Sequence, residues 1–505
     1  MGMLKSISLQ NYKCFKDETT IDIAPLTVLC GVNSSGKSSI LKSLLMMKQS
    51  FENESPYNEM TFNGRWVDNG YFNDIIYHDV PITVDNEESY DKFTILNTFQ
   101  LENTGNSYKH QDLQSFKELK KIFFFVKEIE KIKLSIELVV TRSNNHVNDL
   151  SYYVENNRVS YCKIIISLLN KNDEVCKESF VSIKKYGNDE RIYSLSYNNI
   201  PYYVNNIEKH KFESKSNVRC TCYFSNMHLK NIYRENMDDI LISIKPTILS
   251  IFDIASWQYD GLSFIAPLRQ QPQRNYVLRG NVDSVGIDGG DTPILLAKQF
   301  GKEITTNLFY KNRNNNPLDS MGQIRDKYKV ILQEWLDALH LGEISIQGDN
   351  GLINVNISGH NLVDVGFGIS QILPILVQGI YMQRNQTLML EQPEIHLHPK
   401  MQMQLADFMI SLANSGRNTI IETHSDHIVN RIVRRVMEDQ TGELKQKIKI
   451  YFINRDVKNH PKINLININE FNGIDNAPDE FFTQFGTEIQ NIAKVGINNY
   501  RKSTL

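Results

Sequence analysis

The residues best suited to chemistry lie in one glycine-rich stretch near the N-terminus. Residues 31–38 read GVNSSGKS, which has the spacing G-x-x-x-x-G-K-S. In a loop of this type, backbone amides and a lysine ammonium bind phosphate oxygens, and a serine hydroxyl binds Mg²⁺. We therefore predict that Lys37 contacts the β- and γ-phosphates of ATP and that Ser38 binds Mg²⁺. The other residues expected to line the nucleotide are Asn33, Ser34, Ser35, Gly36 and Ser39.

The flanking residues supply the strand and the helix that a phosphate loop requires. Residues 26–30 form an apolar run suited to a buried strand, and residues 37–49 carry apolar side chains at helical spacing. Gly31 and Gly36 permit backbone angles that are closed to residues with a Cβ. A glycine–serine loop before an ordinary helix is the plain alternative, but strand, loop and helix together favour nucleotide binding.

A second glycine-rich turn precedes an apolar helix in the C-terminal half. Residues 363–376 read VDVGFGISQILPIL, and we predict that the helix begins near Ser370. The N-terminus of such a helix presents unbonded amides and the positive end of the helix dipole. Gly368 and Ser370 are therefore candidate phosphate ligands, although many ordinary helices also begin with glycine and serine.

Two further predicted strands end in side chains suited to phosphate chemistry. Residues 387–399 read TLMLEQPEIHLHP, and residues 420–427 read IIETHSDH. A carboxylate at such a strand end holds the Mg²⁺ water shell in phosphate-loop ATPases, so we expect Glu391 to bind the metal. His424 is a candidate hydrogen-bond donor to the γ-phosphate. Taken singly these are a strand-end acid and a surface histidine, but four pieces in this order favour an ATPase.

A histidine-based metal site is a competing interpretation of the same stretches. His396 and His398 would share one face of an extended segment, and His424 and His427 follow the next strand. No cysteine accompanies them at a zinc-ligand spacing. Zinc binding is therefore the weaker interpretation.

The bulk composition excludes several classes of protein. A chain of 505 residues with a net charge of -3 allows two or three domains, and any nucleic-acid contact would come from a local patch or a partner. Six scattered cysteines do not make a disulfide framework. The N-terminus lacks the apolar core of a signal peptide, and no continuous apolar run reaches the roughly 18 residues of a membrane helix. We therefore expect a cytoplasmic protein with no membrane contact.

The chain divides into four predicted parts. These are an N-terminal lobe of an ATPase head at 1–83, an α+β insertion at 84–258, a C-terminal lobe at 259–475 and a helical tail at 476–505. Short strands are predicted in the insertion at 134–141, 163–169 and 218–224, with helices at 116–132 and 228–256. In the C-terminal lobe we predict a helix at 321–339 and two strands at 343–348 and 352–357.

The order of these motifs resembles the ATPase heads of the ABC class. The phrase EQPEIHLHP and the N-terminal strand pattern narrow the resemblance to the RecF/SMC/OLD-like branch, over residues 1–80 and 260–470. The compact insertion, the phrase APLRQQPQRNY and the C-terminal tail are similar to the ATPase subunits of Septu bacterial anti-phage systems. The resemblance implies an α/β fold, an ABC-type phosphate-loop head with a mixed sheet.

The resemblance also implies partners. In such heads two copies face each other head to tail, and ATP lies between the phosphate loop of one and the glycine–serine turn of the other. Gly368 and Ser370 would then contact nucleotide bound at Lys37 of a second copy, and Lys13 matches a basic residue that approaches phosphate. The other implied partner is a separate HNH-type nuclease, through which nucleic acid would be contacted.

One position departs from the family pattern. In related heads a catalytic glutamate directly follows the magnesium acid, whereas Gln392 follows Glu391 here. Glutamine can orient a water molecule but cannot accept its proton. We therefore predict that Glu391, Gln392 and His424 support slow hydrolysis and that ATP acts mainly as a clamp on a dimer or higher oligomer.

The sequence also suggests which reactions belong to other chains. The acids of the C-terminal tail do not form the paired cluster of a two-metal nuclease, so we predict that this chain is not itself a nuclease. The alternative function is a RecF/OLD-like DNA-repair ATPase that acts directly on DNA. The motor subunit of a membrane transporter fits less well, because such subunits are usually shorter.

Overall fold

The computed structural model describes most of the chain between Gly2 and Phe481. The residues outside this description are 1, 53–59, 78–91, 103–110, 124–125, 127–128, 142–157, 186–191, 204–209, 226, 235–236, 238, 279, 281, 309–323, 350, 458–459, 470–472, 476–477, 479–480 and 482–505. Almost all of the predicted C-terminal helical tail therefore lies outside the described residues.

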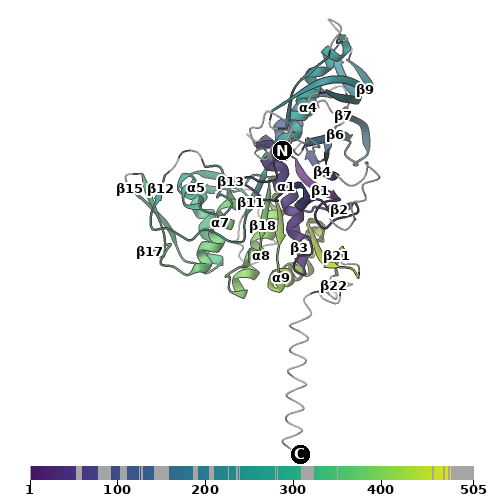
Figure 1. The fold of residues 1–505 in the computed structure, drawn as a ribbon. Helices are drawn as coiled ribbons and strands as arrows, with labels where there is room; N and C mark the ends of the chain where they lie inside the picture. The colour runs from purple at the N-terminus through teal and green to yellow at the C-terminus, as the bar shows by residue number, and fades with distance from the viewer. Residues whose placement is uncertain are drawn as a thin grey trace, which may run out of the picture.

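Seven strands form the central sheet, which carries the phosphate loop (Figure 1). In spatial order they are β11 (Leu262–Ile265), β18 (Thr387–Glu391), β19 (Asn418–Glu422), β3 (Leu26–Gly31), β20 (Ile448–Arg455), β21 (Pro461–Asn469) and β22 (Gly473–Asp475). The first five are parallel neighbours, and the last two pairings are antiparallel. This sheet is the predicted mixed sheet.

The central strands β18, β19 and β3 are almost wholly buried because both faces of the sheet are covered. On β3, Leu26, Val28 and Cys30 belong to the core under the C-terminal lobe, whereas Leu29 belongs to the core under the N-terminal lobe. All five residues from Leu26 to Cys30 are buried. The phosphate loop therefore leaves a strand that is fixed on both sides.

A second sheet is antiparallel and has nine strands among the described residues. Its spatial order runs through β10 (His228–Tyr233), β9 (His210–Ser225), β8 (Ile192–Tyr203), β7 (Val175–Lys185), β6 (Arg158–Leu169), β5 (Lys131–Thr141), β4 (Lys92–Glu102), β1 (Met3–Gln10) and β2 (Thr19–Asp22). The three predicted strands of the insertion are confirmed, but they are parts of longer strands. Because β4 pairs with β1, the insertion continues the sheet that the N-terminal lobe begins.

Two helices predicted in the insertion are wrong over part of their length. Helix α3 (Gln111–Ile122) ends well before 132, and β5 begins at Lys131. The segment predicted as a helix from His228 starts as the edge strand β10, whose Leu229 and Ile232 are buried. Only then does α4 (Asp239–Asp260) follow. In both cases strand pairing prevails over a local helical pattern.

Helix α4 packs across the nine-stranded sheet and reaches the helix that follows the phosphate loop (Figure 1). Its buried face includes Ile244, Ile248 and Ile251. By length and composition, α4 is the one helix among the described residues that could cross a membrane. Fewer than half of the residues in its apolar 18-residue stretch are buried. A core helix of a soluble domain passes the same test, so this is weak evidence for a membrane.

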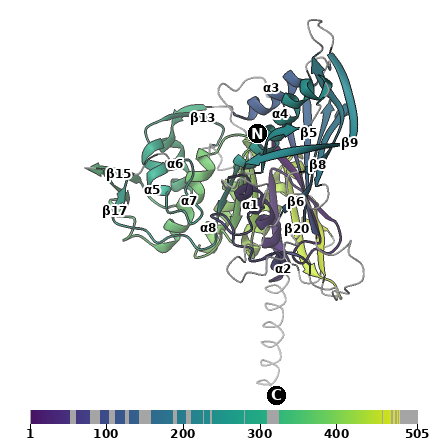
Figure 2. The same ribbon diagram turned by 45° about the horizontal axis from the view of Figure 1, so that its top comes forward.

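One part of the C-terminal lobe, between Tyr276 and Tyr381, projects from the edge of the central sheet, as Figures 1 and 2 both show. Its strands are β12 (Tyr276–Val277), β16 (Leu352–Ile357), β15 (Ile344–Asp349), β17 (His360–Asn361), β13 (Glu303–Thr306) and β14 (Ile324–Lys327), and its helices are α5 (Thr292–Gln299), α6 (Tyr328–Ala338) and α7 (Phe367–Tyr381). The two strands predicted at 343–348 and 352–357 are confirmed. The helix predicted from 321 begins only at Tyr328, because β14 precedes it.

The remaining described helices are α1 (Lys37–Glu52), α2 (Phe72–Ile75), α8 (Pro399–Asn414), α9 (Asp426–Glu438) and α10 (Glu443–Lys447). A buried ion cluster joins α8 to α9. The fully buried carboxylate of Asp407 accepts from Arg431 Nη2 at 2.6 Å and from Arg435 Nε at 2.8 Å. Two guanidinium groups on one carboxylate fix α9 against α8, and α9 follows the strand that ends at Glu422.

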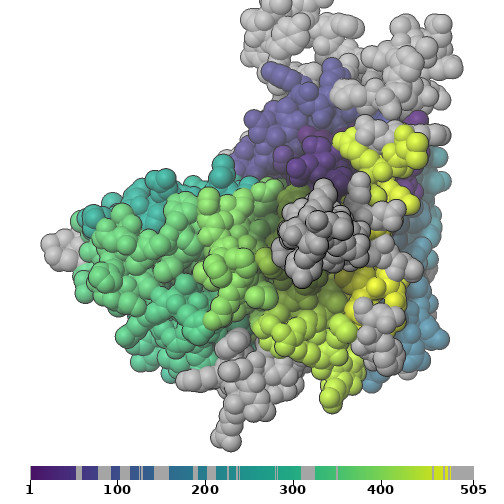
Figure 3. All heavy atoms as spheres, turned by 90° about the horizontal axis from the view of Figure 1, so that it is seen from below, coloured from purple at the N-terminus to yellow at the C-terminus, as the bar shows by residue number. Residues whose placement is uncertain are grey.

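The two ends of the described chain meet at the central sheet. Strand β20 pairs with β3 in parallel, and its Ile453 lies opposite Gly31. Seen from below, the yellow C-terminal strands lie against the purple N-terminal segment (Figure 3). The predicted fold class is confirmed: an α/β phosphate-loop head on a mixed sheet, extended by a second sheet.

Strand β20 leaves no room for a side chain at Gly31, and this can be tested. Gly31 has φ 129°, and a Cβ there would lie 2.0 Å from the Ile453 carbonyl oxygen. We expect Gly31→Ala to lower the free energy of unfolding by roughly 3 kcal/mol or more, from backbone strain and overlap together. Urea unfolding measures this. Gly301→Ala is the control, because a Cβ there meets no described atom within 4 Å, and a loss of equal size in the control would contradict the explanation.

Candidate functional site

Hydrogen bonds to the neighbouring strand β20 fix the conformation of the phosphate loop. The amide of Val32 donates to the Ile453 carbonyl oxygen at 3.2 Å, and Arg455 Nη2 donates to the Ser34 carbonyl oxygen at 2.6 Å. Gly36 has φ 104°, and a Cβ there would lie 2.5 Å from Cys14 Sγ. Both glycines of the motif are therefore required by local geometry.

A cleft of about 180 Å³ lies over this loop. Its lining residues are Lys13, Cys14, Ser34, Ser35, Gly36, Lys37, Ser38, Ser39 and Glu422. Seven of these nine were predicted from the sequence as nucleotide ligands, and the structure brings them together. Asn33 is exposed on the loop beside them and does not line the cleft. The position of Lys13 fits the proximity to phosphate that the resemblance implied.

The Lys37 ammonium is buried and binds carbonyl oxygens of its own loop. Its Nζ donates to Val32 O at 2.6 Å and to Gly31 O at 3.2 Å. Burial lowers the pKa of Lys37, and the nearby carboxylate of Glu422 acts in the opposite direction. A cation held by backbone dipoles in a cleft is prepared to exchange them for phosphate oxygens.

Ser38 has a partner that the sequence interpretation did not assign. Its Oγ donates to Glu422 Oε1 at 2.9 Å, so the acid nearest to the predicted magnesium ligand lies on β19 rather than on β18. The signal was present in the segment IIETHSDH, where the acid precedes His424 by two residues. It was overlooked because Glu391 already matched the expected strand end.

Glu391 and Glu422 face each other across two parallel strands. They are register partners at the ends of β18 and β19. Burial, and then the charge of Glu422, raise the pKa of Glu391 to about 7. Burial also raises the pKa of Glu422, which the hydrogen bond from Ser38 partly offsets. Two buried carboxylates without a cation are unfavourable, so this pair favours a positive ion.

These residues fit the magnesium ion that an ATPase requires. Glu391 Oε1 and Glu422 Oε2 are buried and have no hydrogen-bond partner among the described residues. The hydroxyl of Ser38 lies beside them. Carboxylate and hydroxyl oxygens are the ligands that Mg²⁺ prefers, so the two predicted ligands, Ser38 and Glu391, would hold it and its bound waters. When bound, the metal would neutralise phosphate charge.

The predicted catalytic residues lie close to this pair. The backbone amide of Gln392 donates to the Glu422 carbonyl oxygen at 2.7 Å, and Gln392 adopts φ 44°. The backbone amide of His424 donates to Glu394 Oε1 at 2.7 Å, and its side chain is exposed. Burial lowers the pKa of His424, with a contribution from Lys37. A neutral imidazole at pH 7 can donate one hydrogen bond to a phosphate.

Two arginines pin the loops around the site. Arg269 is buried, its Nη2 lies 3.5 Å from the Glu391 carbonyl oxygen, and burial lowers its pKa to about 10. Arg274 binds both carboxylate oxygens of Asp364, at 2.7 and 2.9 Å, just before α7. The contacts of Arg274 fix the chain before α7 through an ion pair.

The glycine–serine turn lies apart from the phosphate loop of the same chain. Gly366 is the N-cap of α7, no side chain caps this end, and Ser370 Oγ donates to the Phe367 carbonyl oxygen at 2.7 Å. Ser370 lines a different pocket, with Gln270, Gly289 and their neighbours. Within one chain, Gly368 and Ser370 are therefore outside the described lining of the phosphate cleft.

The histidines after β18 have structural partners. His398 caps α8, where its Nδ1 accepts from the Lys400 amide at 3.2 Å. The ring of His396 packs edge-on against Phe367, with ring centroids 4.9 Å apart. Among the described residues, no group of three or more histidine, cysteine, aspartate or glutamate side chains could hold a metal ion.

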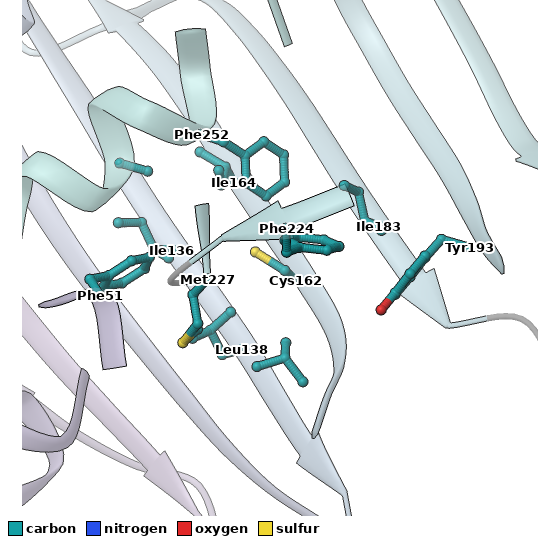
Figure 4. Close-up of a pocket in the computed structure, with 12 residues that line it drawn as sticks. Phe51, Ile136, Leu138, Cys162, Ile164, Ile183, Tyr193, Phe224, Met227 and Phe252 are labelled. Carbon is teal, nitrogen blue, oxygen red and sulfur yellow. The ribbon is translucent and has the colours of Figure 1, made fainter. Parts of the chain in front are cut away.

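A second cavity lies in the extended sheet and is almost wholly apolar (Figure 4). It measures about 30 Å³ and lies between the sheet and α4, where Ile164, Tyr193 and Phe252 line it. Phe51, at the end of α1, reaches the same cavity. Nothing there could bind a phosphate, so the candidate site is the cleft over the phosphate loop.

The phosphate loop, the parallel strands beside it and the two strand-end carboxylates define a phosphate-loop ATPase. Residues 3–429 match the family model described as AAA ATPase domain, and the chain belongs to that family. The phosphate loop after a central parallel strand agrees with the α/β phosphate-loop fold predicted from the sequence. None of the curated proteins matches the chain.

Several solved structures are similar to the chain at low identity. The SMC head domain from Thermotoga maritima has 10% identity and a TM-score of 0.36, covering 92% of this chain and 100% of its own. An SMC head bound to the C-winged helix domain of ScpA has 11% identity and a TM-score of 0.34, and the match covers 93% of this chain and 98% of that structure's chain. A third structure is an Smc head with an extended coiled coil, bound to the C-terminal domain of ScpA and derived from Pyrococcus furiosus. It has 11% identity and a TM-score of 0.34, and the match covers 92% of this chain and 96% of that structure's chain.

The buried carboxylate pair predicts how stability depends on pH without metal. The folded chain holds a proton on Glu391 up to about pH 7, whereas the unfolded chain releases it near the ordinary pKa of 4.5. The free energy of unfolding should therefore fall as pH rises from 4.5 to 7. In EDTA at pH 8 we expect Glu391→Gln to be more stable than the wild type by about 1–3 kcal/mol.

Chemical unfolding at pH 5 and pH 8 tests this expectation. Glu443→Gln is the matched control, since Glu443 is exposed on α10. A Glu391→Gln variant that is less stable than the wild type at pH 8 would show that the pair is not strained in the apo protein.

Proposed function

We propose that this chain is an ATP-gated assembly module, like the PtuA subunit of Septu systems, acting in the bacterial cytoplasm. Two copies bind ATP and Mg²⁺ between their heads, and the assembled form controls a separate HNH-type nuclease in anti-phage defence. The single observation that carries the proposal is that the phosphate cleft and the glycine–serine turn are both formed, but in different places, within one chain.

The turn is suited to complete the site of another copy. Gly366 and Phe367 are exposed, and the N-terminus of α7 presents its amides without a side-chain cap. Such an end attracts anions through its unbonded amides and its dipole. The ion pair between Arg274 and Asp364 fixes the segment that leads into it. In the proposed dimer this end contacts the γ-phosphate held at Lys37 of the other copy.

The clamp role follows from the chemistry at position 392. Gln392 cannot take a proton from the attacking water, and the left-handed backbone there is fixed by its bond to the Glu422 carbonyl oxygen. Turnover is then slow relative to binding, and the bound nucleotide sets the assembly state. Glu391 and His424 act on the metal and the γ-phosphate.

Nuclease activity is assigned to a partner. Of the acids in the C-terminal segment, Asp456 accepts from the His460 amide at 2.7 Å, and Asp475 accepts from Asn469 Nδ2 at 3.0 Å. Both therefore hold local turns. A RecF/OLD-like ATPase acting directly on DNA is the alternative, and it would require ATP turnover that DNA accelerates.

Assembly can be tested by adding charge to the turn. Gly366 has ordinary backbone angles, and a Cβ there meets no described atom within 4 Å, so Gly366→Asp should fold. An aspartate cap even favours the helix, but its charge would face the phosphates of the other copy. We expect ATP to increase the mass of the wild type in solution and to leave Gly366→Asp unchanged.

Two variants complete the mass measurement. Gly366→Asn adds nearly the same volume without charge and should still assemble, whereas Lys37→Ala should lose ATP binding. Full ATP-dependent assembly of Gly366→Asp would contradict a contact between the turn and a triphosphate.

The clamp role predicts the effect of restoring the missing acid. We expect the wild type to hydrolyse ATP at well under about one turnover per second, and Gln392→Glu to be faster by roughly tenfold or more, because general-base catalysis becomes available. Steady-state phosphate release measures both. A wild type that already turns over many times per second, and that Gln392→Glu slows, would exclude the clamp; stimulation by DNA would favour the alternative.

A further inference from the structure

Glu422 has no role in the function proposed above, yet its placement is unusual. It ends β19 inside the cleft, and its side chain is only 4% exposed. One carboxylate oxygen accepts from Ser38 Oγ at 2.9 Å, and the other has no partner among the described residues. A buried carboxylate oxygen without a donor is costly unless a cation binds it.

We propose that Glu422 is a metal-binding residue of the ATP site, which holds Mg²⁺ or its bound waters together with Ser38 and Glu391. The inference depends on the proposed binding of ATP at the phosphate loop. It differs from the expectation drawn from the sequence, in which Glu391 alone was the acidic partner of Ser38. The hydroxyl that a phosphate loop offers to the metal is already hydrogen-bonded to Glu422.

The order of the strands explains why Glu422 is better placed than Glu391. Strand β19 lies directly beside β3, and the amide of Thr423 donates to the Leu29 carbonyl oxygen at 3.0 Å. Strand β18 lies one strand further away. The Gln392 amide donates to the Glu422 carbonyl oxygen at 2.7 Å, so these two residues are neighbours on adjacent strands. The negative charge that the Gln392 side chain lacks is therefore present on the neighbouring residue.

A purely structural role makes a different prediction. If Glu422 only anchored the start of α1, glutamine would serve as well, since its Oε1 accepts the same hydrogen bond from Ser38. Glu422→Gln keeps shape and volume and removes the charge. Because burial disfavours that charge, and the Ser38 hydrogen bond and Lys37 offset the effect only in part, the variant should fold about as well as the wild type.

The test measures Mn²⁺ binding to the full chain by electron paramagnetic resonance, with and without ATP. We expect Glu422→Gln to weaken ATP-dependent Mn²⁺ binding about tenfold or more, as removal of a metal-site residue does. Glu391→Gln should weaken it as well, and the surface control Glu443→Gln should match the wild type. Binding of a fluorescent ATP analogue in EDTA should be retained in Glu422→Gln.

The outcomes separate the two proposals. Mn²⁺ affinity in Glu422→Gln within about twofold of the wild type, with loss in Glu391→Gln, would overturn the role of Glu422 and leave ATP binding intact. A wild type that binds no ATP would overturn the proposed function, and this inference with it. Should Glu422→Gln fail to fold by circular dichroism, Glu422→Asp, which keeps the charge but withdraws it, must weaken Mn²⁺ binding several-fold, and wild-type affinity there would overturn the proposal.

Discussion

Burial of opposite charges at the carboxyl ends of three adjacent strands is the constraint on which the site depends. Strand β3 delivers Lys37, β19 delivers Glu422 and β18 delivers Glu391 to one region of low solvent access. Burial lowers the pKa of the lysine and raises the pKa values of both acids, so burial disfavours each of the three charges. A triphosphate and a divalent cation would relieve both costs together, which couples ligand binding to stability.

The extended sheet is attached to this site through the helix that begins at Lys37. At the far end of α1, the ring of Phe51 stacks on Tyr259 of α4, with ring centroids 5.1 Å apart, and Lys48 Nζ donates to the Tyr259 carbonyl oxygen at 3.3 Å. Helix α4 in turn covers the nine-stranded sheet. The insertion is therefore packed against the phosphate-loop helix itself.

Local patterns predicted the parts of the chain whose structure depends on neighbouring residues. The phosphate loop, the apolar strand that ends at Glu391 and the apolar strand before His424 could be read from composition and spacing. The helix expected to begin near Ser370 is also present, but it begins at Phe367. The continuity of the insertion with β1 could not, because pairing between Leu9 and Ile95 joins segments far apart in the sequence. The helical spacing before Lys131 misled for the same reason, since pairing with β4 and β6 decides the state of that strand.

The importance of Glu422 was hidden by a similar limit. A sequence motif records which acid follows an apolar strand, but not which of two such strands lies beside the loop. Here two strands end in glutamate. The order β18, β19, β3 places Glu422 next to Ser38, whereas Glu391 lies one strand further from the phosphate loop. The same order separates the turn before α7 from the cleft, because α7 belongs to the lobe beyond β18. In the function proposed above, the phosphate cleft and the turn before α7 can act on one nucleotide only if the turn comes from a second copy, because they line different pockets within one chain. This geometric division is the physical reason to expect ATP to control assembly.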